Sequence, residues 1–142
     1  MFVSEVKVDV RYAETDQMGV VYHANYLVWF EIGRTALIKD LGFSYAQMEG
    51  DGFLAPVIDA NLSYKKSMHF GETALIRTWV DSYDGFRTVY AYEVLNPDGE
   101  VAVTGQTHHI VVKKDSFRPV RFKNYYPEWH EAYEKAKKQG ED

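Results

Sequence analysis

One segment constrains the fold more than any other, because it is the single long stretch with the spacing of an apolar helix. Within residues 23–41, Tyr26, Phe30 and Gly33 recur at intervals of four and three, which places them on one helix face. Gly42 follows, at the position where glycine ends many helices. A glycine in a helix interior costs about 1 kcal/mol, so we expect Gly33 to mark a close approach to a sheet.

Most of the remaining chain has the alternation typical of strands. The first candidate, residues 4–12, alternates valine with charged or polar side chains. Turn sequences with glycine at residues 84–85 and 96–99 predict antiparallel hairpins, whereas residues 43–52 are expected to be irregular. The strands expected after the helix cover residues 53–67, 73–82, 87–95 and 100–113.

This order of elements indicates an α+β fold, in which a curved antiparallel sheet is wrapped around one long central helix. Such an arrangement covers the apolar face of the sheet with the fewest elements. A length of 142 residues without a linker predicts a single domain. Residues from about 117 to 142 are expected to form a C-terminal extension, with a short helix over residues 127–138 on which Trp129, Tyr133 and Ala136 form a stripe.

Composition excludes several classes of protein. Hydrophobic residues make up 46% of the chain, which is too many for a disordered protein. The net charge of −5 gives no electrostatic footprint for nucleic acid, and the absence of cysteine excludes disulfides and thiolate nucleophiles. The sequence has neither a signal-peptide pattern nor an apolar stretch of the roughly 20 residues that a membrane helix needs. We therefore expect a cytoplasmic protein without a membrane span.

Motifs for other chemistries are missing from the sequence. It contains no Gly-x-Ser-x-Gly nucleophile turn, no phosphate-binding glycine loop and no dinucleotide motif. His108 and His109 are adjacent in a predicted strand, so their side chains point to opposite faces and are not expected to share a metal ion. No metal and no cofactor are expected. Basic clusters occur at residues 65–66, 113–114 and 118–121; most such clusters are solvated faces, although phosphates could bind at one of them.

The loop between the first strand and the helix carries the residues best suited to chemistry. A helix N-terminus presents N–H groups without partners, which stabilise negative charge on a nearby oxygen. A carboxylate beside them, such as Asp16, could attack a carbonyl or deprotonate a water molecule. From residue types alone, however, Asp16 and Asn25 are both candidates for the helix cap, a single histidine such as His23 is usually structural, and Glu14 is expected to be a solvated charge.

The run from Tyr12 to Tyr26, which includes Thr15-Asp16, Gly19 and Val20-Val21-Tyr22-His23-Ala24-Asn25, resembles the signature of the 4-hydroxybenzoyl-CoA thioesterase type of hot-dog protein. Glu31 and Arg34 extend the likeness, which by order of elements covers residues 3–115. Within this type, the run is most similar to the bacterial acyl-CoA thioesterase branch associated with the Tol–Pal system. The resemblance implies a hot-dog fold whose chains join their sheets, hence a homodimer or homotetramer with active sites between subunits.

The resemblance also assigns roles to residues. It implies that Asp16 is the catalytic carboxylate, that His23 and Tyr12 belong to the site, and that the backbone N–H at His23 polarises the thioester carbonyl. Gln17-Met18 stands where this branch often has small residues, which bears on the shape of the acyl pocket. The residues expected to bind the acyl-CoA or other acyl thioester are Tyr22, Asn25, Lys65 and Lys66.

Three functions remain open for such a chain. The first is hydrolysis of an acyl thioester, with Asp16 as nucleophile or general base. The second is a module that binds acyl-CoA without cleaving it, for which a carboxylate at the carbonyl is not needed. The third is a hydratase or dehydratase on the same fold. The length of the acyl chain, and the choice between CoA and acyl-carrier protein, are not determined by the sequence.

Overall fold

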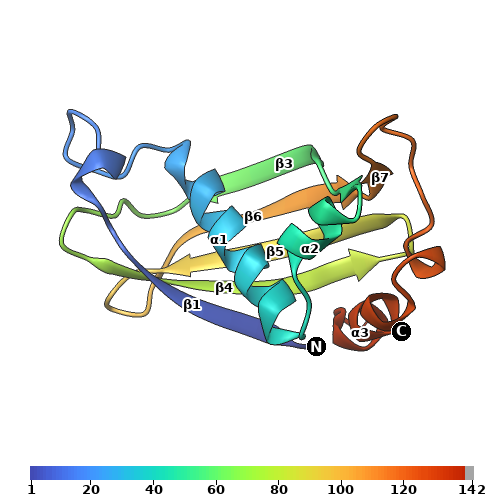
Figure 1. Ribbon diagram of the computed structural model, residues 1–142. Coiled ribbons are helices and arrows are strands. Elements are labelled where there is room, and N and C mark those ends of the chain that lie inside the picture. Colours follow the sequence, from blue (N-terminus) through green and yellow to red (C-terminus); the bar gives the residue numbers. More distant parts are fainter. Residues whose placement is uncertain (140–142) are drawn as a thin grey trace.

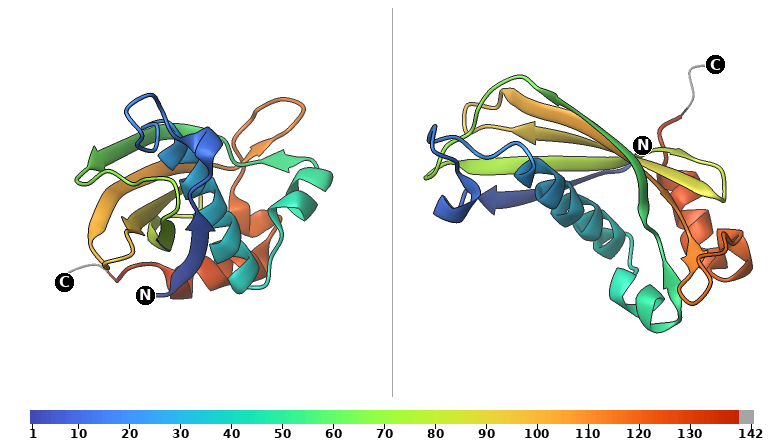
Figure 2. Two further views of the ribbon diagram at one scale, coloured as in Figure 1. Left: turned by 90° about the vertical axis from the view of Figure 1, so that its left-hand side faces the viewer. Right: turned by 90° about the horizontal axis from the view of Figure 1, so that it is seen from above.

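The computed structural model describes residues 1–139 and shows a curved antiparallel sheet packed against one long helix (Figure 1). Helix α1 spans Asn25–Asp40 and lies along one face of the sheet, where β1 and β4 are its main neighbours (Figure 2). The sheet has the spatial order β1-β4-β5-β6-β3, so β1 and β3 are its edges. Its strands are β1 (Val3–Asp9), β3 (Val57–Tyr64), β4 (Thr73–Tyr83), β5 (Arg87–Leu95) and β6 (Val101–Ile110). This arrangement confirms the α+β prediction.

Two expected strands are shorter than predicted. The stretch 53–67 is interrupted at Pro56, which has no N–H to donate to a ladder, and divides into β2 (Phe53–Leu54) and β3. The stretch 100–113 likewise divides into β6 and β7 (Val112–Lys113), and β7 pairs with β2. The predicted hairpins β4–β5 and β5–β6 are both present.

The segment expected to be irregular contains a short helix, α2 (Tyr45–Gly50). The Ser44 hydroxyl caps it by accepting a hydrogen bond from the Gln47 backbone N–H (3.2 Å). A six-residue helix is too short to leave a clear periodic pattern, which is why the sequence did not predict it. Two 3₁₀ turns complete the chain, η1 (Tyr12–Glu14) and η2 (Phe122–Asn124).

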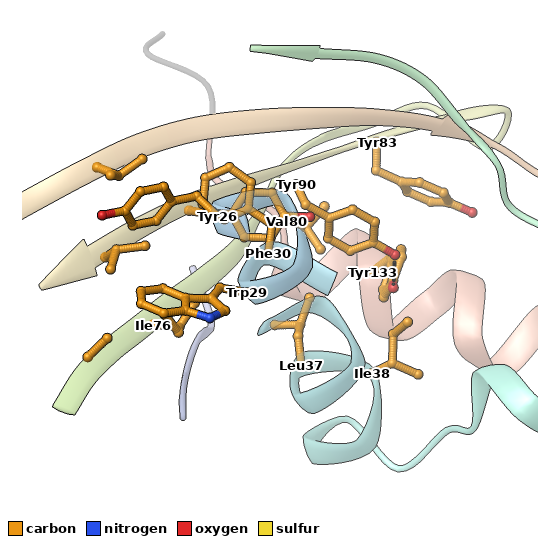
Figure 3. Packing of buried hydrophobic residues seen from close by; sticks show 14 of the residues in the cluster. Tyr26, Trp29, Phe30, Leu37, Ile38, Ile76, Val80, Tyr83, Tyr90 and Tyr133 are labelled. Atoms are coloured by element: carbon orange, nitrogen blue, oxygen red, sulfur yellow. Dashed lines mark hydrogen bonds between the residues drawn. The ribbon is translucent and has the colours of Figure 1, made fainter. Parts of the chain in front are cut away.

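The buried face of α1 packs closely on the sheet. The ring of Phe30 stacks on that of Tyr92 with centroids 4.1 Å apart, and Trp29, Leu37 and Ile38 point into the same cluster (Figure 3). A Cβ atom added at Gly33 would lie 2.9 Å from Ile76 Cγ2 and still closer to the Thr78 hydroxyl. The predicted close approach at Gly33 is therefore confirmed.

The two ends of α1 differ in how well they were predicted. Gly42 has φ +96°, and the Phe43 N–H donates to the Ile38 carbonyl at 3.0 Å, as expected for a helix ending in glycine. At the other end, the residue before the helix is Ala24, which makes no side-chain cap. Neither Asp16 nor Asn25 caps the helix, because both side chains make hydrogen bonds within the preceding loop.

The C-terminal segment is built into the fold through helix α3 (Pro127–Ala136). The predicted stripe of Trp129, Tyr133 and Ala136 is the buried face of this helix. The Lys138 N–H donates to the Val80 carbonyl (2.8 Å), and the Phe2 N–H donates to the Ala136 carbonyl (3.0 Å). Residues 140–142 of the expected extension lie outside the described residues. Within residues 1–139, no helix combines the length and apolar character needed to cross a membrane.

Candidate active site

A hollow of about 320 Å³ lies beside the start of α1, between the loop that precedes the helix and the end of β3. It brings together four of the residues predicted for the site. Those four are Asp16, His23, Lys65 and Lys66. The hollow is also lined by Met18 and Tyr64.

Asp16 is held by the turn in which it lies. Its Oδ1 accepts a hydrogen bond from the Met18 N–H (2.8 Å), and its own N–H donates to the Val20 carbonyl (2.9 Å). Gly19 closes the turn with φ +81°, a conformation that glycine adopts without strain. Among residues 1–139, no group donates to the second carboxylate oxygen, Oδ2. The turn therefore positions Asp16 while leaving one oxygen available for chemistry.

Two backbone N–H groups at the start of α1 are available to a ligand. From Asn25 to Leu27, the backbone N–H groups donate to carbonyls three residues earlier, as Asn25 does to Tyr22 (2.9 Å). In the described part of the chain, the N–H groups of His23 and Ala24 donate to no other group. Unpaired N–H groups at the positive end of a helix are suited to an oxyanion.

Glu14 is buried, with 5% of its surface exposed, so the expectation of a solvated charge was wrong. Its carboxylate accepts hydrogen bonds from the Arg11 N–H (2.8 Å) and the Trp29 indole N–H (2.9 Å). Burial raises the pKa of this carboxyl, but the hydrogen bonds from Arg11 and Trp29 outweigh that effect and hold it below the ordinary value. Glu14 thereby fixes the loop that precedes α1 to the helix.

The sequence indicated only that the Trp29 indole N–H, on a buried helix face, needs an acceptor, and not that Glu14 supplies it. The Glu14 carbonyl completes the attachment, accepting from the Asn25 side chain (2.8 Å) and the Tyr22 N–H (2.8 Å). Asn25, predicted to bind substrate, is thus engaged in holding the loop.

Tyr64 is a lining residue that sequence reasoning missed. Its hydroxyl donates to the His23 carbonyl (3.3 Å), and its ring meets that of Tyr26 at 5.9 Å. It comes from β3, far along the chain from the loop, and no local pattern connects the two.

Like Asn25, the predicted residues Tyr12 and Tyr22 lie outside the lining of the hollow. The Tyr12 side chain is 76% exposed and its ring packs edge-on against Phe70, with centroids 5.6 Å apart. The Tyr22 ring lies 4.4 Å from that of His23, tilted by 48°, and is exposed to solvent. In the single chain, Tyr12 is therefore not brought to Asp16.

The two lysines at the hollow differ in their partners. Lys66 Nζ lies 2.8 Å from Glu100 Oε2, and this hydrogen bond raises the pKa of the lysine and lowers that of Glu100. Lys65 makes no salt bridge within residues 1–139. Its ammonium group is therefore the more available of the two for an anionic ligand.

Comparison with known proteins places this chain in a family. Residues 10–130 match the family described as the thioesterase-like superfamily. The Bacillus subtilis protein named "Putative acyl-CoA thioesterase YneP" is 60% identical over 138 residues, which cover 97% of this chain and 100% of that protein. A 1,4-dihydroxy-2-naphthoyl-CoA hydrolase from Thermosynechococcus vestitus is 25% identical, covering 84% of this chain and 83% of its own. The crystal structure of a DHNA-CoA thioesterase from Staphylococcus aureus superposes with a TM-score of 0.93 at 50% identity, covering 95% of this chain and 91% of that one.

Proposed function

The chain belongs to the thioesterase-like superfamily, and we propose from this premise that it hydrolyses an acyl-CoA to a free acid and CoA, with Asp16 as the catalytic carboxylate. Relatives named as acyl-CoA and DHNA-CoA thioesterases support thioester hydrolysis. The observation that supports the assignment to this site is that Asp16 and His23 line one hollow at the start of α1, where the N–H groups of His23 and Ala24 have no partner in the described structure. The Tol–Pal branch and the cytoplasmic location stay predictions.

The thioester carbonyl oxygen accepts hydrogen bonds from the N–H groups of His23 and Ala24. Negative charge that develops on this oxygen is stabilised there by the donors and by the helix dipole. Asp16 Oδ2 then acts in one of two ways. As a general base it takes a proton from water, whose oxygen adds to the carbonyl carbon while the C–S bond breaks and the leaving thiolate takes up a proton. As a nucleophile it forms an acyl–carboxylate anhydride, releases the thiolate and is freed by water.

Lys65 is the proposed partner for a CoA phosphate. It lines the same hollow as Asp16, and its charge is not engaged by a carboxylate in the described structure. A lysine binds phosphate as a point charge, so the contact contributes to affinity more than to orientation. Lys66 contributes less, because Glu100 holds its ammonium group.

We also propose that the functional unit is a homodimer at least, formed along β3. This strand is an edge of the sheet, and nearly all of its residues are exposed in the single chain. Val57 and Tyr64 expose 48% and 53% of their surfaces, and Leu27 and Val28 of the neighbouring helix expose 40% and 45%. An unpaired edge strand beside apolar side chains favours pairing with another copy.

The first prediction tests the carboxylate. Asp16→Asn keeps the shape of the side chain but removes its charge and its basicity, so kcat/KM for acyl-CoA hydrolysis should fall at least about 100-fold. Release of free thiol from a panel of acyl-CoAs measures the rate, and binding of CoA should be retained. His23→Ala should lose less, because alanine keeps the backbone N–H.

The matched control is Asp115→Asn, which neutralises an exposed aspartate outside the hollow and should leave the rate unchanged. Full activity of the Asp16→Asn protein, with contaminating esterase excluded, would remove Asp16 from the mechanism and favour a module that only binds acyl-CoA. A larger loss at His23 than at Asp16 would reverse the two roles.

A further inference from the structure

The segment that follows β7 gathers positive charge in an otherwise acidic protein. Residues 113–123 contain five basic residues and one acidic residue, whereas the other 131 residues contain 11 basic and 20 acidic ones. The five basic residues are Lys113, Lys114, Arg118, Arg121 and Lys123. All five are exposed, and none makes a salt bridge within residues 1–139. Their charge is therefore available to attract an anionic partner outside the chain.

Three of these cations meet at one hollow of the surface. Lys113, Arg118 and Arg121 line a hollow of about 360 Å³, together with Asn124 and Tyr125. Of the described residues that line it, no charged or polar one is buried. A site for a small soluble ligand usually contains a few fixed polar groups that set the orientation of the ligand. This open arrangement of cations is better suited to an extended anionic surface.

Phe117 lies at the tip of the turn between these cations. Its φ is +56°, a conformation that bulky side chains rarely adopt and that is unfavourable for them. The turn is closed by hydrogen bonds from the Phe117 N–H to the Lys113 carbonyl (2.8 Å) and from the Lys113 N–H to the Arg118 carbonyl (3.0 Å). The ring adds nothing to the core, because 58% of the residue is exposed. An apolar ring held in this way is placed for contact with something outside the chain.

Two further aromatic side chains flank the same cations. The guanidinium carbon of Arg121 lies 4.7 Å from the centroid of the Phe86 ring, in the turn between β4 and β5. The Phe122 N–H donates to the Gly85 carbonyl (3.0 Å), which joins the two loops at one end of the sheet (Figure 1). Phe86 and Tyr125 expose 41% and 46% of their surfaces. Exposed aromatic rings among basic side chains are typical of a surface that lies in the boundary layer of a membrane.

We propose that this end of the protein docks reversibly onto a lipid bilayer that carries anionic head groups. The docking surface consists of Phe86, Lys113, Phe117, Arg118, Arg121 and Tyr125. The cations contact the phosphates of the head groups, and the ring of Phe117 enters the boundary between head groups and acyl chains. A nucleic-acid duplex would attract the same cations but provides no apolar layer for this ring. The docking is independent of the chemistry proposed for Asp16.

Sedimentation with vesicles tests the role of charge. The full-length protein should bind vesicles of phosphatidylglycerol and phosphatidylcholine, but not vesicles of phosphatidylcholine alone. Most of the binding should be lost in about 0.5 M KCl, which screens the charges. Arg118→Gln should weaken binding about 5-fold, because a basic residue near an anionic membrane contributes about 1 kcal/mol. The control, Lys7→Gln, removes an exposed lysine of β1 outside the docking surface and should cause no such loss.

Phe117→Asn separates docking from folding. Asparagine adopts a positive φ more readily than phenylalanine, so the melting temperature should stay the same or rise. Binding to the anionic vesicles should nevertheless fall roughly 5- to 10-fold, because no ring enters the bilayer. Phe117→Trp, which keeps an aromatic ring, should retain the binding. Phe70→Asn removes a similarly exposed ring (60%) from another loop and should leave the binding unchanged.

Four results would overturn membrane docking. The first is a wild-type protein that stays in the supernatant with anionic vesicles. The second is binding that salt weakens but Phe117→Asn does not, which would indicate a surface for polyanions in general. The third is displacement by inorganic phosphate beyond that by KCl at equal ionic strength, which would indicate a site for free phosphate. The fourth is a matching loss of activity toward soluble acyl-CoA in Arg118→Gln, which would place the phosphates of CoA here.

Discussion

His109 shows how one buried side chain couples folding to pH. It is 3% exposed, and its ring nitrogens lie 2.9 Å from the Ala55 carbonyl and 2.8 Å from the Thr107 hydroxyl. Burial lowers its pKa from 6.5 to about 4, because a charged imidazole would be poorly solvated there. The folded protein therefore holds His109 neutral at pH values where the unfolded chain is already protonated.

The second prediction follows from this difference. Between pH 6.5 and about 4 the unfolded state binds one proton more at His109, so stability rises with pH across that window. The contribution of neutral His109 to the free energy of unfolding is of the order of 3 kcal/mol. It is fully present above pH 6.5 and is lost as the pH falls through about 4. Urea unfolding at several pH values should show this slope, and His109→Gln should reduce it. His69→Gln, which alters an exposed histidine, should keep it; an equal slope in the His109 variant would contradict the assignment.

That Asp16 and His23 lie together was predictable, whereas the burial of Glu14 and the place of Tyr64 at the hollow were not. The first two lie in a short run whose spacing resembles a known signature. Glu14 belongs to the same run, yet its burial depends on the indole of Trp29, fifteen residues away. Tyr64 reaches the site only because the sheet brings the end of β3 beside the loop. The pattern of neighbouring residues does not indicate contacts between residues that lie far apart in the sequence.

At the scale of elements, the close packing of α1 on the sheet gives the third prediction. Gly33→Leu places a side chain where Ile76 and Thr78 already lie, so it should lower the free energy of unfolding by about 1–3 kcal/mol or more. A thermal melt should show a fall of several degrees. Gly50→Leu is the matched control, because a Cβ there meets nothing within 4 Å and the backbone needs no positive φ. An unchanged melting temperature for Gly33→Leu would contradict the packing.

The elements that the sequence predicted well are those whose geometry is set within a few residues. The β4–β5 and β5–β6 hairpins follow from tight turns, and the face of α1 follows from helical spacing. The division of residues 53–67 depends on one proline, and the six-residue helix α2 depends on a single serine cap. β3 was expected from its pattern, but only the sheet order shows that it is an edge strand.

At the scale of the whole molecule, the open β3 edge gives the fourth prediction. The protein should sediment at micromolar concentration with at least twice the 16.4 kDa mass of one chain. Val28→Asp places a charge on the exposed apolar face of α1, so it should favour the monomer and reduce thioesterase activity. Ser116→Asp adds the same charge at an exposed site away from β3, and it should change neither the sedimenting mass nor the thioesterase activity. A wild-type protein that sediments only as single chains would refute the dimer.

The hydrogen bond between Phe2 and Ala136 bears on how the chain folds during synthesis. Phe2 precedes the first strand, but its partner in α3 is made only after every strand of the sheet. Until α3 emerges, the ring of Phe43 lacks its stacking partner Trp129, whose centroid lies 5.0 Å away in the finished fold. A nascent chain that already carries the loop before α1 and the whole sheet therefore still exposes aromatic surface to chaperones until α3 covers it.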